Sequence, residues 1–213
     1  MTLLPLILAL GITTDAHAKG KGDEKVGVRL KFNAPLWTQT TTKVTIDGEE
    51  PDGFEPTKTS ALTLLNGQNR TELTYLLGDG LEVGGLLGYS RGKSVTDGDE
   101  TGLYSDLTIG VTGAYNFKLG DGMMLFAQPV ISYTKTSGQA DPDADKAGFK
   151  GFGIGADVGL RFNLAKGIHI DPAVEYFRQG FVPWSDADGF ENDPEQKLTG
   201  SNLGLRLGLG VKF

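Results

Sequence analysis

The stretch LGLRLGLGVKF, from Leu203 to Phe213, decides the fold. Large apolar side chains stand at every second position, and glycine, arginine or lysine fills the positions between them. A period of two is typical of a β-strand, because successive side chains point to opposite sides of the strand. A helix would scatter the leucines around its circumference. These residues are therefore predicted to form a strand with one apolar face and one small or polar face.

The same alternation recurs around three tight turns. Gly-Asp-Gly stands at residues 78–80 and again at 120–122, and Leu164-Ala165-Lys166-Gly167 is a related sequence. Asp-Gly between alternating segments is a strong hairpin signal, because both residues tolerate positive φ. The segments that follow the turns carry their apolar residues in one shared phase, which predicts a series of long hairpins. These segments are residues 81–91, 123–133 and 168–178.

Eight strands follow from this pattern, with short turns at one end and four long polar connections at the other. The strands are predicted at residues 25–34, 59–77, 81–92, 103–118, 122–136, 149–164, 168–180 and 198–213. The second strand loses its alternation at residues 66–69, where a β-bulge would account for the break. The connections, rich in glycine, proline, serine and acidic residues, are about 35–58, 93–102, 137–148 and 181–197. The chain is therefore predicted to be all-β, an eight-stranded antiparallel up-and-down barrel.

The composition excludes several classes of function. The chain has 213 residues and no cysteine, so it carries no disulfide, thiolate metal site or cysteine nucleophile. Its formal net charge of -7 argues against binding to nucleic acid, whose phosphates attract lysine and arginine. Asp141, Asp143 and Asp145 resemble the start of a calcium loop, but its later glycine and glutamate are missing. We expect no cofactor and no metal site.

The N-terminus is predicted to be an export signal peptide. Leu3 to Ile12 is a short apolar core, and Ala16-His17-Ala18 supplies small residues for cleavage. Residues 1–18 are accordingly assigned to the signal and residues 19–213 to a barrel domain. No run approaches the roughly 20 apolar residues that a spanning helix needs, so a membrane crossing would require a closed barrel.

Two closed barrels fit such a meander. A soluble, lipocalin-like barrel has its apolar face inside, whereas a transmembrane barrel turns that face toward lipid. Gly151, Gly153, Gly155 and Gly159 share the polar face of one strand, which favours the transmembrane barrel. Glycine weakens a water-exposed strand but leaves room in a narrow lumen. Aromatic residues at both ends of the strands bracket a band of about 20–25 Å, as at two membrane interfaces.

At this level the chain resembles the small eight-stranded outer-membrane β-barrel proteins of Gram-negative bacteria, of the OmpX and OmpA-barrel type. The resemblance rests on the export signal, the hairpins over residues 25–213 and the terminal strand that ends in Phe213. It implies a location in the cell outer membrane, among outer-membrane lipid and lipopolysaccharide. It also implies that Phe213 is an assembly signal read by the barrel-assembly machinery. We expect a monomer.

Charged residues on the inward phase are predicted to form a structural network in the lumen. Their signs nearly balance, which favours pairing, because an unpaired buried charge is costly. They are Arg29, Lys31, Arg70, Glu72, Glu82, Asp157, Arg161, Asp171, Glu175 and Arg206. A narrow ion pathway is the alternative, whereas an open pore is not expected from eight strands.

A second group of charges lies on the outward phase, just beyond the loop-side aromatics. We hypothesise that this group contacts lipopolysaccharide phosphates; snorkelling or solvation is the alternative. The group consists of Arg91, Lys135, Lys150 and Arg178.

Catalysis is not expected. His169 is the one histidine after the signal, and Ser132 lies about six residues too far along its own strand to form a nucleophilic site with His169. The sequence therefore predicts an integral outer-membrane protein with a structural role in the envelope and acidic surface loops. The alternatives are adhesion or ligand binding through the loops, limited passage of solutes or ions, and, with least support, an enzyme acting on outer-membrane lipid.

Overall fold

The structure, a computed structural model, is all-β in the part of the chain that it describes. It describes residues 27–46, 49–53, 55–62, 69–96, 99–139, 144–187 and 197–213. The strands are β1 (Gly27–Thr45), β2 (Thr57–Leu62), β3 (Arg70–Gly78), β4 (Leu81–Thr96), β5 (Asp99–Gly120), β6 (Met123–Gln139), β7 (Ala147–Ala165), β8 (Ile168–Ser185) and β9 (Lys197–Lys212). Within these residues there is no helix of the length and apolarity that crossing a membrane requires. The predicted signal peptide, residues 1–18, lies outside the described residues.

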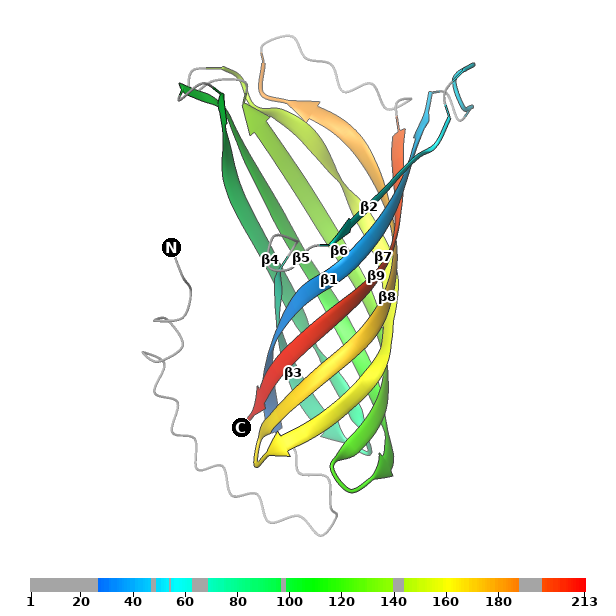
Figure 1. The fold of residues 1–213 in the computed structure, drawn as a ribbon, viewed down its shortest axis with the longest axis vertical. Coiled ribbons are helices and arrows are strands. Elements are labelled where there is room, and N and C mark those ends of the chain that lie inside the picture. Colours follow the sequence, from blue (N-terminus) through cyan, green and yellow to red (C-terminus); the bar gives the residue numbers. More distant parts are fainter. Residues whose placement is uncertain are drawn as a thin grey trace.

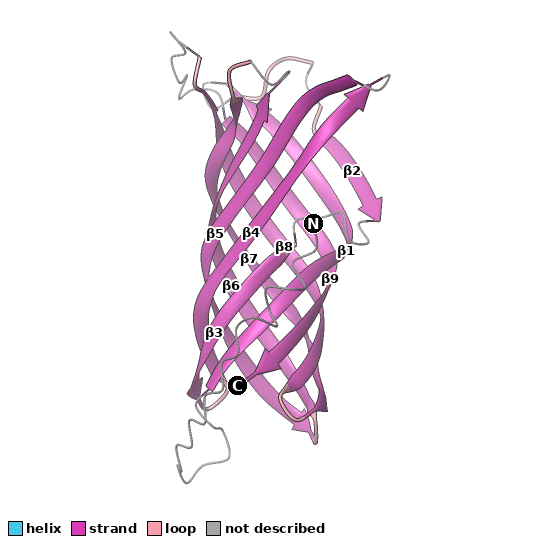
Figure 2. Ribbon diagram, turned by 90° about the vertical axis from the view of Figure 1, so that its left-hand side faces the viewer, coloured by secondary structure: helices cyan, strands magenta, loops and turns pink. Residues whose placement is uncertain are grey.

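The strands close into a tilted barrel (Figures 1 and 2). Consecutive strands from β3 to β9 pair antiparallel, and β9 then pairs with β1 from Arg29 to Thr45. β1 pairs through its other edge with β3, so the ring has no free edge at this junction. The predicted terminal strand is confirmed as the one that closes the barrel. Phe213 extends the closure, because its backbone N–H donates to the carbonyl of Val28 at 2.9 Å.

The second predicted strand, residues 59–77, is two strands in the structure. β2 pairs with the part of β1 from Trp37 to Thr42, and β3 pairs with the part from Gly27 to Asn33. β9 occupies the opposite edge of β1 over both parts, so β2 and β3 follow one another along the same edge of β1. β3 also pairs with β4, whereas β2 has no strand partner besides β1 among the described residues. The predicted ring of eight strands is therefore formed by β1 and by β3 to β9, and β2 is added along the edge of β1.

β1 is longer than predicted and changes phase midway. Its register with β9 shifts between Pro35 and Trp37, as at a β-bulge. Before the shift Asn33 faces the lumen, and after it Thr38 and Thr40 do. The prediction of a connection from residue 35 onward was wrong because the extra residue inverts the alternation on which strand recognition depends.

The three predicted turns are confirmed, and together they define the turn end of the barrel. Asp79 and Gly80 both have positive φ, at 50° and 79°, and Gly122 and Gly167 also lie in the left-handed region. This is the conformation that Asp-Gly and similar pairs supply. The C-terminus lies at the same end in Figure 1, and the longer connections lie at the opposite, loop end.

The two faces of the wall carry the residues that the alternation assigns to them. On the outside, Val111, Phe152 and Tyr89 have more than half of their surface exposed, as lipid-facing side chains do in a protein without its bilayer. On the inside, Arg161 is 1% exposed and Phe126 is fully buried. The prediction that apolar residues lie outside and polar residues inside, the reverse of a soluble barrel, agrees with the structure.

Glycine makes room in the lumen, as its clustering on β7 predicts. A Cβ at Gly159 would lie 2.8 Å from the ring of Phe126, and one at Gly155 would meet the ring of Phe177. A side chain at either position would therefore clash both with a lumen ring and with the backbone of β8, at Pro172 or Tyr176.

Most of the acidic connections lie outside the described residues. These include residues 140–143, where the calcium-like aspartates begin, and residues 188–196. The strands extend further toward them than predicted, and β6 and β7 reach Gln139 and Ala147. Above the apolar band both faces of a strand meet water, so the alternation that marks a strand is lost there.

Candidate functional site

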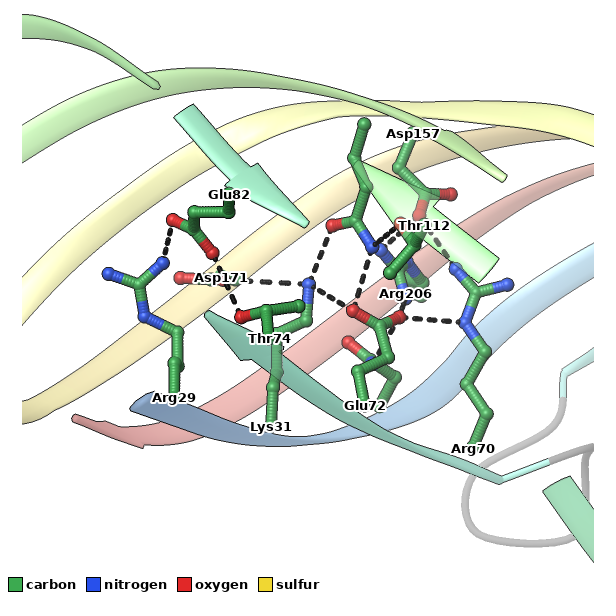
Figure 3. A network of polar contacts seen from close by, with 12 residues as sticks. Arg29, Lys31, Arg70, Glu72, Thr74, Glu82, Thr112, Asp157, Asp171 and Arg206 are labelled. Carbon is green, nitrogen blue, oxygen red and sulfur yellow. Dashed lines mark hydrogen bonds and ion pairs between the residues drawn. The ribbon is translucent and has the colours of Figure 1, made fainter. Parts of the chain in front are cut away.

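An ionic network crosses the lumen and includes all ten predicted residues. Its two parts are joined by one long contact, 4.0 Å between the ammonium of Lys31 and the carboxylate of Asp171. Five are cationic and five are anionic, and each makes at least one ion pair with another member. The pairs join β1, β3, β4, β7, β8 and β9, while side chains of β5 and β6 complete the ring through amide hydrogen bonds. Every strand of the closed ring thus contributes to one buried, neutral cluster (Figure 3).

Glu72 on β3 is the first centre of this cluster and is fully buried. Lys31 approaches it at 2.8 Å, Arg70 at 3.1 Å and Arg206 at 3.2 Å. The amides of Asn33 and Gln128 donate to the same carboxylate at 2.8 and 2.7 Å. Figure 3 shows it between Lys31 and Arg70. So many charge-assisted hydrogen bonds offset the cost of burying one carboxylate.

Arg161 on β7 is the second centre, nearer the turn end. Its guanidinium contacts both oxygens of Asp171, with Nη2–Oδ2 at 2.8 Å, and donates to Glu82 at 2.8 Å. A further hydrogen bond, 2.5 Å long, goes to the amide oxygen of Asn116. Arg29 completes this centre through its ion pair with Glu82. The planar fork of arginine suits such multiple contacts better than lysine would.

The loop-side boundary of the network is formed by two arginines that share two carboxylates. Arg70 contacts Asp157 at 2.6 Å and Glu175 at 2.9 Å. Arg206 pairs with Asp157 as well and lies 4.0 Å from Glu175. The charges at this boundary therefore compensate one another, and none faces the upper lumen without an opposite partner.

Several residues that belong to the lumen network were not predicted from the sequence, because they are uncharged. Asn33, Asn116 and Gln128 link the ion pairs, and Phe126 lies beneath Lys31 and Arg161, with their charged groups 5.5 and 5.3 Å from the ring centroid. All of them stand on the inward phase of their strands, which is the signal that could have found them. Their cation–π and amide contacts stabilise cations that are withdrawn from water.

His169 is buried at the turn-side edge of the network, with Nε2 3.7 Å from Asp171. Its Nε2 has no hydrogen-bond partner among the described residues, so no serine or threonine hydroxyl is paired with it there. The expectation that the chain is not an enzyme stays a prediction. Within the described ranges, no group of three or more candidate ligands is placed to hold a metal ion.

The four predicted rim residues do not form one cluster. Lys135 and Lys150 are direct register partners on β6 and β7, whereas Arg91 lies opposite Ser105 on β5 and Arg178 lies opposite Ile154 on β7. The ammonium of Lys135 also lies 3.8 Å from the ring centroid of Trp184. The structure thus singles out one lysine pair.

Comparison with solved structures identifies the fold. No protein-family model matches the chain, and no curated protein does either. Among solved structures, the outer membrane protein OprG from Pseudomonas aeruginosa superposes with a TM-score of 0.53 at 13% identity, over 89% of this chain and 97% of OprG. The fold is that of a small outer-membrane β-barrel.

Two further structures agree. Neisserial surface protein A has a TM-score of 0.51 at 14% identity, and the alignment covers 89% of this chain and all of that protein. AlkL, solved in lipid bilayers, has a TM-score of 0.51 at 12% identity and covers 95% and 97% of the two chains. With the apolar exterior, this shared fold identifies the chain as an integral protein of the cell outer membrane.

Proposed function

We propose that this protein is a structural outer-membrane barrel whose lumen is closed to ions and solutes. The observation that carries the proposal is the neutral ten-residue network, to which every strand of the ring contributes directly or through an amide. Charges that are hydrogen-bonded to one another from wall to wall leave no continuous water path at their level. A role in envelope integrity requires a stable barrel and no transport step.

A purified wild-type barrel is expected to give no steady conductance in planar lipid bilayers. The physical reason is that an ion would have to displace buried salt bridges to pass the level of Glu72 and Arg161. Current would be recorded across bilayers that contain the refolded protein. A sixteen-stranded porin in the same lipid would serve as the positive control, since barrels of that size have an aqueous channel. Stepwise, reproducible openings by this protein would contradict the proposal.

The lysine pair on the outer surface supports a second element of this function, contact with lipopolysaccharide. Lys135 and Lys150 are cross-strand neighbours, and like charges in that arrangement repel each other unless an anion lies between them. Both are on the lipid-facing phase near the loop end, where lipopolysaccharide phosphates would be found. We propose that this pair holds one such phosphate, while Arg91 and Arg178 contact the headgroup region separately.

Changing Lys135→Gln and Lys150→Gln together is expected to lower lipopolysaccharide retention about thirtyfold. Each basic residue near an anionic membrane surface contributes about 1 kcal/mol to binding. Lipopolysaccharide that remains bound after detergent exchange would be quantified by mass spectrometry. The matched control carries Lys118→Gln and Lys166→Gln, which remove two exposed lysines at the turn end. Equal retention by both double variants would overturn the assignment.

Assembly and partner binding stay proposals that rest on the sequence. Phe213 is exposed beside the closing strands, where assembly machinery could contact it. Adhesion through the acidic connections depends on segments that lie largely outside the described residues.

A further inference from the structure

The loop-side half of the lumen contains a cavity above the ionic network. Its volume is about 340 Å³. Arg70 and Arg206 line its lower end, and its wall reaches Thr42 near the end of β1 and Phe181 near the end of β8. The ionic network therefore lies between this cavity and the turn end of the barrel.

The charges at the lower end of the cavity already have opposite partners. Arg70 contacts Asp157 at 2.6 Å and Glu175 at 2.9 Å. Arg206 pairs with Asp157 and, at 3.2 Å, with Glu72. Because the ten-residue network holds equal numbers of cations and anions, it brings no net charge to the cavity. The net charge of the cavity therefore depends on the residues higher in its wall.

One carboxylate in that wall, on Asp106 of β5, has no cationic partner among the described residues. The hydroxyl of Ser90 on β4 donates to its Oδ2 at 3.0 Å, but that hydroxyl is uncharged. Asp106 is partly exposed and lines the cavity, so a molecule in the cavity can reach it. An uncompensated charge in a concave site with low-dielectric walls concentrates ions of the opposite sign. The cavity therefore favours a cation.

The neutral donors nearest to Asp106 are directed elsewhere. Thr108, the next inward residue on β5, shares a 3.0 Å hydrogen bond with the hydroxyl of Thr134 on β6. The amide nitrogen of Gln179 on β8 donates to the same hydroxyl at 3.1 Å. These groups bond to one another, and Ser90 remains the donor to the carboxylate of Asp106. That carboxylate thus keeps acceptor capacity for a ligand.

Aromatic side chains of β8 form another part of the wall. Phe177 and Phe181 both line the cavity, and they lie on the same inward phase of the strand. The ring of Phe177 lies across Gly153 and Gly155 of β7, where a Cβ at either position would meet it. Aromatic rings bind apolar bodies and also attract a cation to their faces. The cavity therefore combines an anionic group with an aromatic surface.

We propose that this cavity binds a small organic cation, a protonated primary amine on an apolar body about the size of one ring. The ammonium group donates a charge-assisted hydrogen bond to Asp106, and the apolar body packs against Phe177 and Phe181. A metal ion fits less well, because within the described ranges no group of three or more candidate ligands is placed to hold one. The barrel is then a receptor for amines, beyond its proposed structural role.

The test uses the full-length protein in nanodiscs of zwitterionic lipid and three probes of similar size. At neutral pH benzylamine is a cation, benzyl alcohol is uncharged and benzoate is an anion. Saturation-transfer NMR, with empty nanodiscs subtracted, would report binding. We expect benzylamine to bind with a Kd of about 1 mM, as its size allows, and each of the other probes at least about tenfold more weakly.

Asp106→Asn removes the charge and keeps the shape of the side chain and an acceptor for Ser90. It should weaken benzylamine at least about tenfold and leave benzyl alcohol unchanged. The matched control is Asp145→Asn, which removes the same charge from an exposed side chain near the loop end that does not line the cavity. This control should bind benzylamine within about twofold of the wild type. An equal loss in both variants would mean general attraction by an acidic protein and would overturn the proposal.

A pair of glycine variants shows whether binding occurs inside the lumen. Gly200 lines the cavity, and a Cβ there has nothing within 4 Å; the same is true of Gly180, which is exposed on the outward phase of the adjacent strand. Gly200→Leu fills part of the cavity and should reduce benzylamine binding at least about fivefold. Gly180→Leu adds the same bulk outside the barrel and should leave binding unchanged.

Heat-modifiable gel migration would establish that each variant forms a barrel. Benzylamine binding that is unaffected by Asp106→Asn or by Gly200→Leu in a folded barrel would contradict the assignment. Equal binding of the three probes to the wild type would do so as well.

Discussion

Replacing Glu72 by glutamine is expected to destabilise the barrel by about 3 kcal/mol. The carboxylate is fully buried and serves Lys31, Arg70 and Arg206 at once. Glutamine keeps the shape but removes the charge, so three buried cations face one carboxylate fewer. Removing one partner of a buried ion pair typically costs 3–5 kcal/mol, because the remaining charge is left uncompensated. Reversible urea unfolding in lipid vesicles, followed by tryptophan fluorescence, would measure the change.

The matched control is Glu50→Gln. Glu50 also pairs with a lysine, Lys43, at 2.7 Å, but both side chains are about half exposed. Exposed ion pairs contribute about 0–1 kcal/mol, so this variant should unfold almost as the wild type does. A double variant, Lys31→Met with Glu72→Gln, should lose less stability than the two single variants together, with a coupling of about 1–3 kcal/mol. Equal effects of Glu72→Gln and Glu50→Gln would show that the lumen network is solvated.

The sequence predicts the barrel well where one face of a strand meets lipid and the other meets the lumen. There the alternation is complete, and β4 and β7 follow it over the apolar band. The prediction weakens wherever this contrast is lost. In β1 one extra residue near Pro35 inverts the phase. In the segment before Arg70 the single predicted strand is replaced by β3 in the ring and by β2 on the edge of β1. Neither event has a local signal as strong as Asp-Gly in a turn.

The alternation in the sequence assigns the charged residues to the lumen network, but it does not show which of them pair with one another. Lys31 and Gln128 are 97 residues apart in sequence and make a 2.7 Å hydrogen bond. That contact depends on how the strands are staggered around the closed barrel, which the alternation does not determine. The cavity above the network, lined by Arg70, Arg206 and Phe177 among others, was not predicted for the same reason, because its wall combines the shifted phase of β1 with the upper parts of β8 and β9.

Changing Val158→Arg should destabilise the barrel in a bilayer by about 2–4 kcal/mol. Val158 points outward from β7, is 51% exposed and lies between the aromatic residues Phe152 and Phe162 on the same face. An arginine on the lipid face near the middle of the bilayer must bring its charge into hydrocarbon or distort the lipid around it. Its register partner, Val174, is also outward and apolar, so no neighbouring carboxylate can compensate. Urea unfolding in phospholipid vesicles would give the free energy.

The same substitution near the loop end provides the comparison that decides what the outer face meets. Val182→Arg places the charge beside Lys150 on the adjacent strand, at the edge of the apolar band, where the cost should fall to about 0–1 kcal/mol. In a soluble barrel both positions would meet water, and Val182→Arg, which lies opposite Lys150, would cost at least as much as Val158→Arg. A steep difference between the two variants therefore follows only if Val158 lies in lipid, whereas equal and small effects would contradict the transmembrane orientation of the whole wall.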